Sequence, residues 1–138
     1  MEIREFLPAD REKAAAVWLT AAVRSNPALP EEFWLARYRA LWRALPCHRT
    51  LLAAVDGEIE GVLVLAAPEE IGALGVGPSC RRKGHASALL AAAGAGPLSV
   101  WVPADNTETI EFLQKRGFAA GQTRPCGEFG QELQLTRR

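Results

Sequence analysis

A loop rich in glycine and cations stands out in the middle of the chain. It lies within the stretch Leu74–Ala86, which is typical of a strand end, a loop and a helix start, and it contains the consecutive cations Arg81, Arg82 and Lys83. The apolar run Leu89–Ala93 predicts a helix after the loop, whose first backbone N–H groups have no partner within the helix. Such donors, the positive end of the helix dipole and the nearby cations together favour a bound phosphate. The alternative is an ordinary strand-to-helix connection whose cations face water.

The size and charge of the chain limit what else it can be. Its 138 residues, 49% of them hydrophobic, are enough for one domain that buries a core without disulfides or metal, so we expect a single domain over residues 1–138. Lys plus Arg and Asp plus Glu number 16 each, which argues against nucleic acid or a membrane surface as partner. No apolar run approaches the roughly 20 residues of a membrane span, and the N-terminal residues lack the apolar core of a signal peptide, so we expect a soluble, unprocessed protein.

The cysteines do not indicate a disulfide framework or a metal site. Cys47, Cys80 and Cys126 are odd in number, widely spaced and outside any C-x-x-C pattern. They suit the reducing cytoplasm, where we expect the protein to be located, and we expect no metal. Cys80 adjoins the loop, but a small buried hydrophobe is a better interpretation of it than a catalytic thiol.

Hydrophobic patterning predicts the element order β-α-α-β-β-β-α-β-α-β-β. The first helix is expected after Pro8 and Asp10, and the second from Pro30 to the stop at Pro46. The pair Asp56-Gly57 predicts a hairpin between two apolar strands. Apolar patterns typical of strands predict the strands 1–7, 50–55, 58–66, 71–76, 98–102, 118–124 and 131–136. Patterns typical of helices predict two further helices, 84–93 and 105–116.

Two local signals define the last helix. Asp105 followed by Glu108 is typical of a capping box at a helix start. Gly117 stands where a left-handed residue ends a helix. Asn106 lies between them and has two interpretations, as part of the helix cap or as a hydrogen-bonding group for a ligand.

These motifs together resemble the GNAT superfamily of acyl-CoA N-acyltransferases. The stretch Arg81 to Ala86 fits the family's Gln/Arg-x-x-Gly-x-Gly/Ala loop, with alanine in place of the last glycine. Asn106, the helix carrying Phe112, and Gly117-Phe118 are similar to the family's second motif. The N-terminal half, with Trp18 and Trp34 among its aromatic residues, is similar to a small bacterial single-domain subgroup.

The resemblance implies a fold and a cofactor. The fold is an α/β (α+β) arrangement in which about seven strands form a mixed, mostly antiparallel central sheet flanked by four helices. The cofactor is acetyl-CoA as co-substrate, transferring its acetyl group to a primary amine. Residues implied in binding coenzyme A are Leu74, Gly75, Val76, Arg81, Arg82, Lys83, Gly84, His85, Ala86, Asn106 and Phe112. Asn106 would hold the pantetheine arm near the thioester, and His85 is expected to be an exposed loop residue.

The chemistry implied by the resemblance requires two proton transfers. A lysine-like ammonium is deprotonated in only about one molecule in 2,500 at pH 7, so such an acceptor needs a base, whereas an α-amino group hardly does. Glu70, before the central strand, is the carboxylate best placed to serve, and two solvated carboxylates at Glu69 and Glu70 are the alternative. Many family members protonate the leaving thiolate with a tyrosine, where this chain has Leu113. A lost acid costs about 10²–10⁴ in rate, so a slower enzyme or a substitute acid is expected.

The acceptor is not identified by the sequence. The resemblance implies that the strand ending at Val76 and the strand 98–102 splay apart to admit the pantetheine arm. Asn26, Leu29 and Trp101 are the candidate substrate-contacting residues, because the first two lie in a Pro-interrupted connection and Trp101 lies beside the splayed strands. A non-catalytic acyl-CoA-binding or sensing domain is the alternative function. The oligomeric state is expected to be monomer or homodimer, with no nucleic acid and no membrane as partner.

Overall fold

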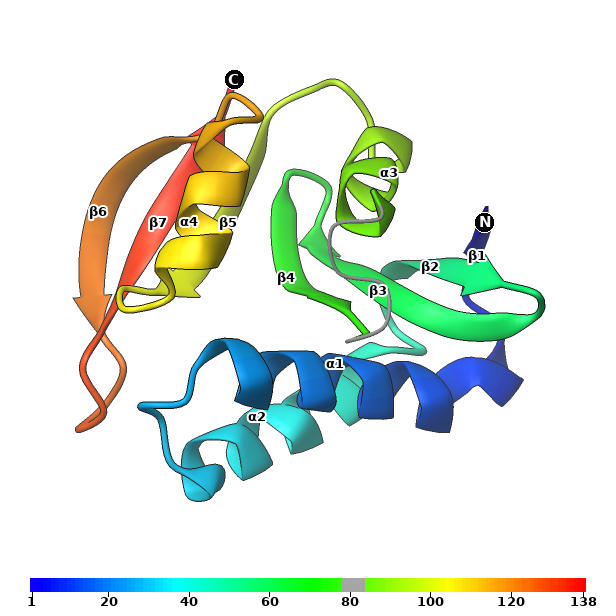
Figure 1. The fold of residues 1–138 in the computed structure, drawn as a ribbon, viewed down its shortest axis with the longest axis horizontal. Coiled ribbons are helices and arrows are strands. Elements are labelled where there is room, and N and C mark those ends of the chain that lie inside the picture. Colours follow the sequence, from blue (N-terminus) through cyan, green and yellow to red (C-terminus); the bar gives the residue numbers. More distant parts are fainter. Residues whose placement is uncertain (78–83) are drawn as a thin grey trace.

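The computed structural model describes residues 1–77 and 84–138 and shows an open, seven-stranded sheet with helices on both faces (Figure 1). The strand order is β1-β2-β3-β4-β5-β7-β6. The elements in chain order are β1 (Glu2–Glu5), a 3-10 turn (Pro8–Asp10), α1 (Arg11–Ser25), α2 (Glu31–Ala44), β2 (Arg49–Val55), β3 (Glu58–Ala67), β4 (Glu70–Val76), α3 (His85–Ala92), β5 (Leu98–Pro103), α4 (Thr107–Gln114), β6 (Ala119–Pro125) and β7 (Gln131–Arg137). The predicted fold and element order are confirmed.

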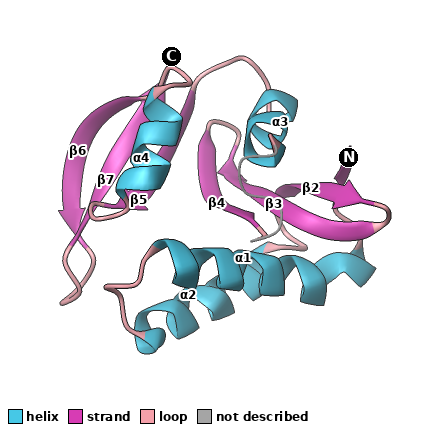
Figure 2. Ribbon diagram, viewed as in Figure 1, coloured by secondary structure: helices cyan, strands magenta, loops and turns pink. Residues whose placement is uncertain are grey.

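The central strands β2 and β3 are buried on both faces, which explains their nearly continuous apolar runs. Side chains alternate across a strand, so Val62 and Val64 of β3 face one side and Leu63 and Leu65 face the other. The first pair belongs to the core beneath α1 and α2, and the second to the core beneath α3 and α4. Figure 2 shows α1 and α2 on one side of the sheet and α3 and α4 on the other.

The junction between β4 and β5 is the irregular point of the sheet. Every other strand pair is antiparallel, whereas β4 and β5 are parallel. Their register covers only Glu70 with Ser99 and Ile71 with Val100. Beyond these two pairs the strands diverge (Figure 1). The backbone of residues 72–76 therefore has β3 on one side and no strand on the other.

The predicted hairpin turn at Asp56-Gly57 and the predicted helix end at Gly117 are both confirmed. Asp56 and Gly57 both have positive φ, +51° and +82°, as a tight hairpin turn requires. Gly117 has φ +90°, and the Phe118 N–H donates to the Leu113 carbonyl at 3.1 Å, so the predicted left-handed helix end is confirmed.

The predicted capping box at Asp105 and Glu108 is wrong. Helix α4 begins at Thr107 with Asn106 as its N-cap, and the Asn106 Oδ1 accepts the Thr109 N–H at 3.2 Å. Asn is as good a cap as Asp, and the side chain one residue later reaches the free N–H groups of the first turn. None of the described helices is long and apolar enough to cross a membrane.

Candidate functional site

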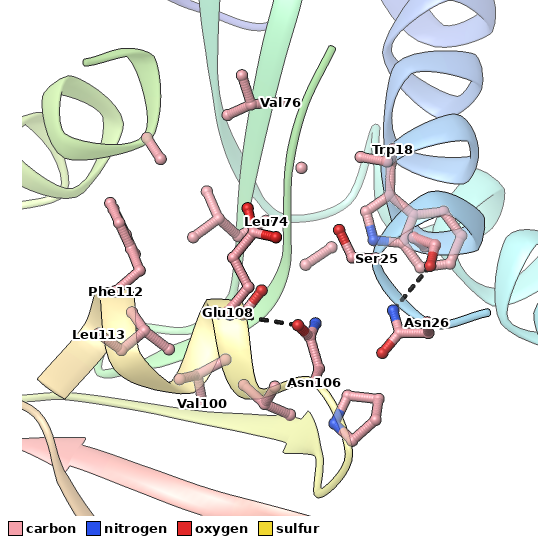
Figure 3. Close-up of a pocket in the computed structure, with 18 of the residues that line it drawn as sticks. Trp18, Ser25, Asn26, Leu74, Val76, Val100, Asn106, Glu108, Phe112 and Leu113 are labelled. Carbon is pink, nitrogen blue, oxygen red and sulfur yellow. Dashed lines mark hydrogen bonds between the residues drawn. The ribbon is translucent and has the colours of Figure 1, made fainter. Parts of the chain in front are cut away.

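A cavity of about 670 Å³ lies where β4 and β5 diverge. Its walls come from the end of α1, the unpaired edge of β4, the start of α3, the second half of β5, and α4 (Figure 3). Ten of the residues predicted for cofactor or substrate contact line it, and they are Leu74, Gly75, Val76, Gly84, His85, Ala86, Asn106, Phe112, Asn26 and Trp101. The divergence of two strands thus brings together residues that are far apart in the chain.

The strand side of the cavity is the free edge of β4. Leu74, Gly75 and Val76 line the cavity there. Gly75 permits a close approach of α1, because a Cβ at this position would lie 3.2 Å from the Trp18 Cα and 3.2 Å from the Ala21 Cβ. The edge therefore offers backbone N–H and C=O groups to an extended ligand, much as a sheet edge accepts an added strand.

The start of α3 forms a second wall. Gly84 precedes the helix with φ +83°, a conformation that favours glycine, and a Cβ there would meet no atom within 4 Å. Gly84 and Ala86 both line the cavity, and neither places a large side chain between it and the first turn of α3. The predicted ligands Arg81, Arg82 and Lys83, and also Cys80, lie outside the described residues.

His85 differs from the sequence-based expectation. It is only 5% exposed and lines the cavity, so the prediction of an exposed loop residue is wrong. Helix α3 begins at this residue, and its side chain is packed inside the domain instead of standing on a loop. Neither ring nitrogen has a hydrogen-bond partner among the described residues. A buried donor or acceptor without a partner costs about 1–3 kcal/mol, so a polar ligand atom would stabilise this imidazole.

Helix α4 supplies the wall opposite α3. Leu113 is 1% exposed and lines the cavity, so an apolar side chain occupies the place for which the resemblance implies a tyrosine. Arg116 joins the two walls: its Nε donates to the Ser87 Oγ of α3 at 2.8 Å, and its guanidinium lies 3.7 Å from the centre of the Phe112 ring. The sequence did not single out Arg116, because it follows the helix as one charged residue among many.

At the end of the cavity near α1 and α2, three polar side chains come together. Asn26 donates its Nδ2 to the Ala22 carbonyl at 2.7 Å, while its Oδ1 is buried without a partner among the described residues. The Trp34 Nε1 is likewise buried and without a partner in the described part of the chain. Arg37 of α2 also lines this end. The site therefore presents one acceptor without a partner in the described chain, the Asn26 Oδ1. It also presents two kinds of donor, the indole N–H of Trp34 and the guanidinium of Arg37.

Glu132 completes this end of the cavity, and sequence reasoning missed it. Its carboxylate accepts the Arg124 Nε at 3.0 Å and lies 3.3 Å from the Arg37 Nη1. In β7 the apolar face is carried by Leu133 and Leu135, so the pattern places Glu132 on the polar face and predicts a solvated carboxylate. The structure buries it because the two arginines from other elements compensate its charge.

Burial also affects a neighbouring thiol. Burial raises the pKa of the Cys126 thiol, and the negative charge of Glu132 raises it further. Both effects favour the protonated thiol over the reactive thiolate.

Two predicted site residues do not line the cavity. Glu70 stands at the other end of β4, where the strand pairs with Ser99 of β5 and with Ala67 of β3. Leu29 packs against the apolar core beneath α1 and α2. Among the residues that the structure describes, no group of three or more side chains could hold a metal ion.

Comparisons with known proteins agree with this geometry. Solved structures similar to this chain include a GCN5-related N-acetyltransferase from Rhodopseudomonas palustris, with 27% identity, a TM-score of 0.80, and coverage of 99% of this chain and 94% of the other. The PaiA N-acetyltransferase from Thermoplasma acidophilum, solved in complex with coenzyme A, has the same fold at 19% identity, a TM-score of 0.83 and coverage of 99% and 98%.

YjaB from Escherichia coli, solved in its apo form, shares the fold at 21% identity, a TM-score of 0.84 and coverage of 98% and 95%. No curated protein matches significantly. The family model described as the acetyltransferase (GNAT) family matches residues 14–118, which is most of the chain. The chain belongs to the GNAT family of acetyltransferases.

Proposed function

We propose that this protein is an N-acetyltransferase that moves an acetyl group from acetyl-CoA to a primary amine, with both substrates bound together. The observation that carries the proposal is the cavity at the divergence of β4 and β5, which combines a free strand edge with the open start of a helix. Membership of the GNAT family supports it, as does the coenzyme A bound to the PaiA relative.

Each wall of the cavity suits one part of the donor. The backbone of Leu74–Val76 would pair with the amides of the pantetheine arm. The N–H groups at the start of α3, with Arg81, Arg82 and Lys83, would hold the pyrophosphate. His85, buried without a partner among the described residues, would gain a hydrogen bond from a group bound there. The Asn106 Oδ1 accepts a hydrogen bond in the α4 cap, and its Nδ2, which has no partner among the described residues, would donate to the arm.

The reaction needs positioning more than acid–base assistance. The amine nitrogen forms a bond to the acetyl carbon, the carbon–sulfur bond breaks, and its electron pair goes to sulfur. The nitrogen gives up one proton, and the thiolate takes one directly or from solvent. A thiol has a pKa near 8.5, so coenzyme A can leave as a thiolate beside the apolar Leu113. Without a general acid, the rate is expected to be lower by about 10²–10⁴.

Further expectations belong to the same proposal. We expect a single-domain protein that acts in the cytoplasm of a bacterium, as a monomer or homodimer. We expect it to work without a metal, nucleic acid or membrane partner. Asn26 and Trp101 line the cavity where an acceptor would enter, and they stay candidates for acceptor contact.

The test is release of free thiol from acetyl-CoA in the presence of a broad panel of amines, amino acids and peptides. We expect release that depends on the added amine, with acetyl-CoA binding measured separately by calorimetry. Absence of both binding and release would contradict the proposal.

A second candidate is an acyl-CoA-binding domain that does not turn over. The buried Leu113 favours it, because no tyrosine stands at that place in α4. Micromolar acetyl-CoA binding without thiol release across the whole panel would support this candidate over the enzyme.

A further inference from the structure

We infer that the acceptor is an amine that also carries a carboxylate, and that Arg37 binds this carboxylate. The inference rests on the proposed function and concerns the end of the cavity between α1, α2 and β7. It names a class of substrate that neither the family nor the related structures specify for this chain.

The first observation is the free hydrogen-bonding capacity of Arg37. Its side chain lines the cavity and is 40% exposed, while its guanidinium lies 4.4 Å from the centre of the Phe33 ring. Only Nη1 is engaged with Glu132, at 3.3 Å. Nε and Nη2 have no hydrogen-bond partner among the described residues. A planar guanidinium that is held by a ring face and one carboxylate still presents donors that suit a second carboxylate.

The second observation is the charge of the cluster. Glu132 is 3% exposed and interacts with both Arg37 and Arg124. Arg124 is held in turn by Trp101, whose ring centre lies 3.9 Å from the guanidinium carbon. Two cations and one anion leave this cluster with an excess of one positive charge. The other described charged residues that line the cavity lie on or just after α4 and balance one another, and they are Glu108, Glu111, Lys115 and Arg116. This excess favours an anionic group on the acceptor and disfavours a second ammonium at the same place.

The third observation is independent of charge. Asn26 is 8% exposed and lines the same cavity. Its amide orientation is determined, because only Nδ2 can donate to the Ala22 carbonyl, at 2.7 Å. The other atom of the amide is thus the Oδ1, which has no partner among the described residues. Figure 3 shows it pointing away from α1. An oxygen that can only accept suits the N–H groups of an amine.

These groups complement the two ends of one small molecule. Asn26 would accept from the amine, and Arg37 would donate to the carboxylate, so the amine is directed towards the thioester side of the cavity. Arg37 does not touch the reacting atoms in this arrangement. It is a specificity-determining residue, and its removal should change which amine is preferred more than how tightly coenzyme A binds.

The test uses pairs of amines that differ only in the carboxylate: 4-aminobutyrate with propylamine, and phenylalanine with phenethylamine. For each pair, kcat/KM is measured by thiol release from acetyl-CoA, and affinity for the protein saturated with coenzyme A by calorimetry. We expect at least one carboxylated amine to exceed its partner by about 10-fold or more.

Two variants on α2 show whether Arg37 causes the preference. Arg37→Gln should reduce the preference to less than about 3-fold. Arg39→Gln removes the same charge from an exposed position of α2 outside this cavity and should keep the preference. Coenzyme A affinity, measured for both variants, reports whether the cavity is intact.

The outcomes separate this inference from the proposed function. Turnover with equal kcat/KM for both members of every pair, or a preference that survives Arg37→Gln, overturns the inference and leaves the acetyltransferase proposal standing. Binding of a carboxylated amine that depends on Arg37, without any thiol release, supports the inference and contradicts the enzyme. Absence of both turnover and preferential binding overturns both.

Discussion

Gly75 of β4 and Trp18 of α1 are in direct contact at the cavity wall, because glycine brings no side chain between the strand and the helix. A Cβ at Gly75 would lie 3.2 Å from the Trp18 Cα, closer than side chains normally pack. The neighbour is helix backbone, which cannot rotate away. The small size of Gly75 thus allows the strand edge to pack closely against α1.

Gly75→Ala should therefore destabilise the protein. Forcing one methyl group against the α1 backbone costs about 1–3 kcal/mol, which urea unfolding would measure as a lower midpoint. Gly96→Ala is the matched control, since a Cβ there meets no atom within 4 Å. Equal midpoints for the two variants would contradict the close contact.

Gly84→Asp should weaken coenzyme A binding by at least about 10-fold, because it places a carboxylate where the pyrophosphate is proposed to lie. Gly94→Asp separates this effect from backbone strain. Gly84 and Gly94 both have positive φ, +83° and +111°, and open space around them, but only Gly84 lines the cavity. Calorimetry with coenzyme A on both variants checks the prediction, and an unchanged affinity for Gly84→Asp would exclude the assigned site.

Asp10 should make stability depend on pH. Its carboxylate accepts from Arg4 at 2.8 and 3.0 Å and from the Leu7 N–H at 2.8 Å. The Arg4 hydrogen bonds lower the pKa of Asp10 below its ordinary value, and the Leu7 bond adds to this. A lowered folded-state pKa means that the stabilisation is complete above the unfolded pKa near 4, and is lost as pH falls through the folded value.

Asp10→Asn should therefore lower the free energy of unfolding by about 1–2 kcal/mol at pH 7, with the difference shrinking below about pH 4. Urea titrations at several pH values would measure it. Glu12→Gln removes an exposed carboxylate of α1 and should show a smaller difference. A constant penalty for Asp10→Asn between pH 7 and pH 3 would be incompatible with the ion pair as its cause.

Glu70→Gln should change kcat/KM by less than about 3-fold, because Glu70 does not line the cavity and the loss of a general base typically costs 10²-fold or more. The pH profile of kcat/KM should then follow the pKa of the amine acceptor. A loss of 10²-fold or more in Glu70→Gln, rescued at high pH, would instead establish Glu70 as a base that acts through water.

The success of the sequence-based predictions depended on how local their causes are. The Asp56-Gly57 turn and the Gly117 helix end are determined by backbone preferences of single residues, and both hold. The α4 cap is local too, but Asp105 and Asn106 compete for it on nearly equal terms. Sequence alone does not decide between two adjacent good caps.

Features formed by distant segments could not be predicted in this way. Arg37 and Glu132 come from different halves of the chain, and each follows the polar pattern of its own element. Their meeting depends on how β7 is placed relative to α2, about which periodicity says nothing. His85 is similar, since its burial results from the packing of α3 against the sheet.

The two residue pairs that join β4 to β5 leave an unpaired sheet edge in the interior of the sheet. Exposed edges recruit further strands and are a common route to aggregation. Here the edge lies within a cavity of about 670 Å³ that α1, α3, α4 and β5 line, and not at the outer margin of the sheet. The domain thereby keeps the backbone hydrogen-bonding groups of residues 72–76 available in the middle of the sheet, where a second domain cannot dock edge to edge as it can on an outer strand.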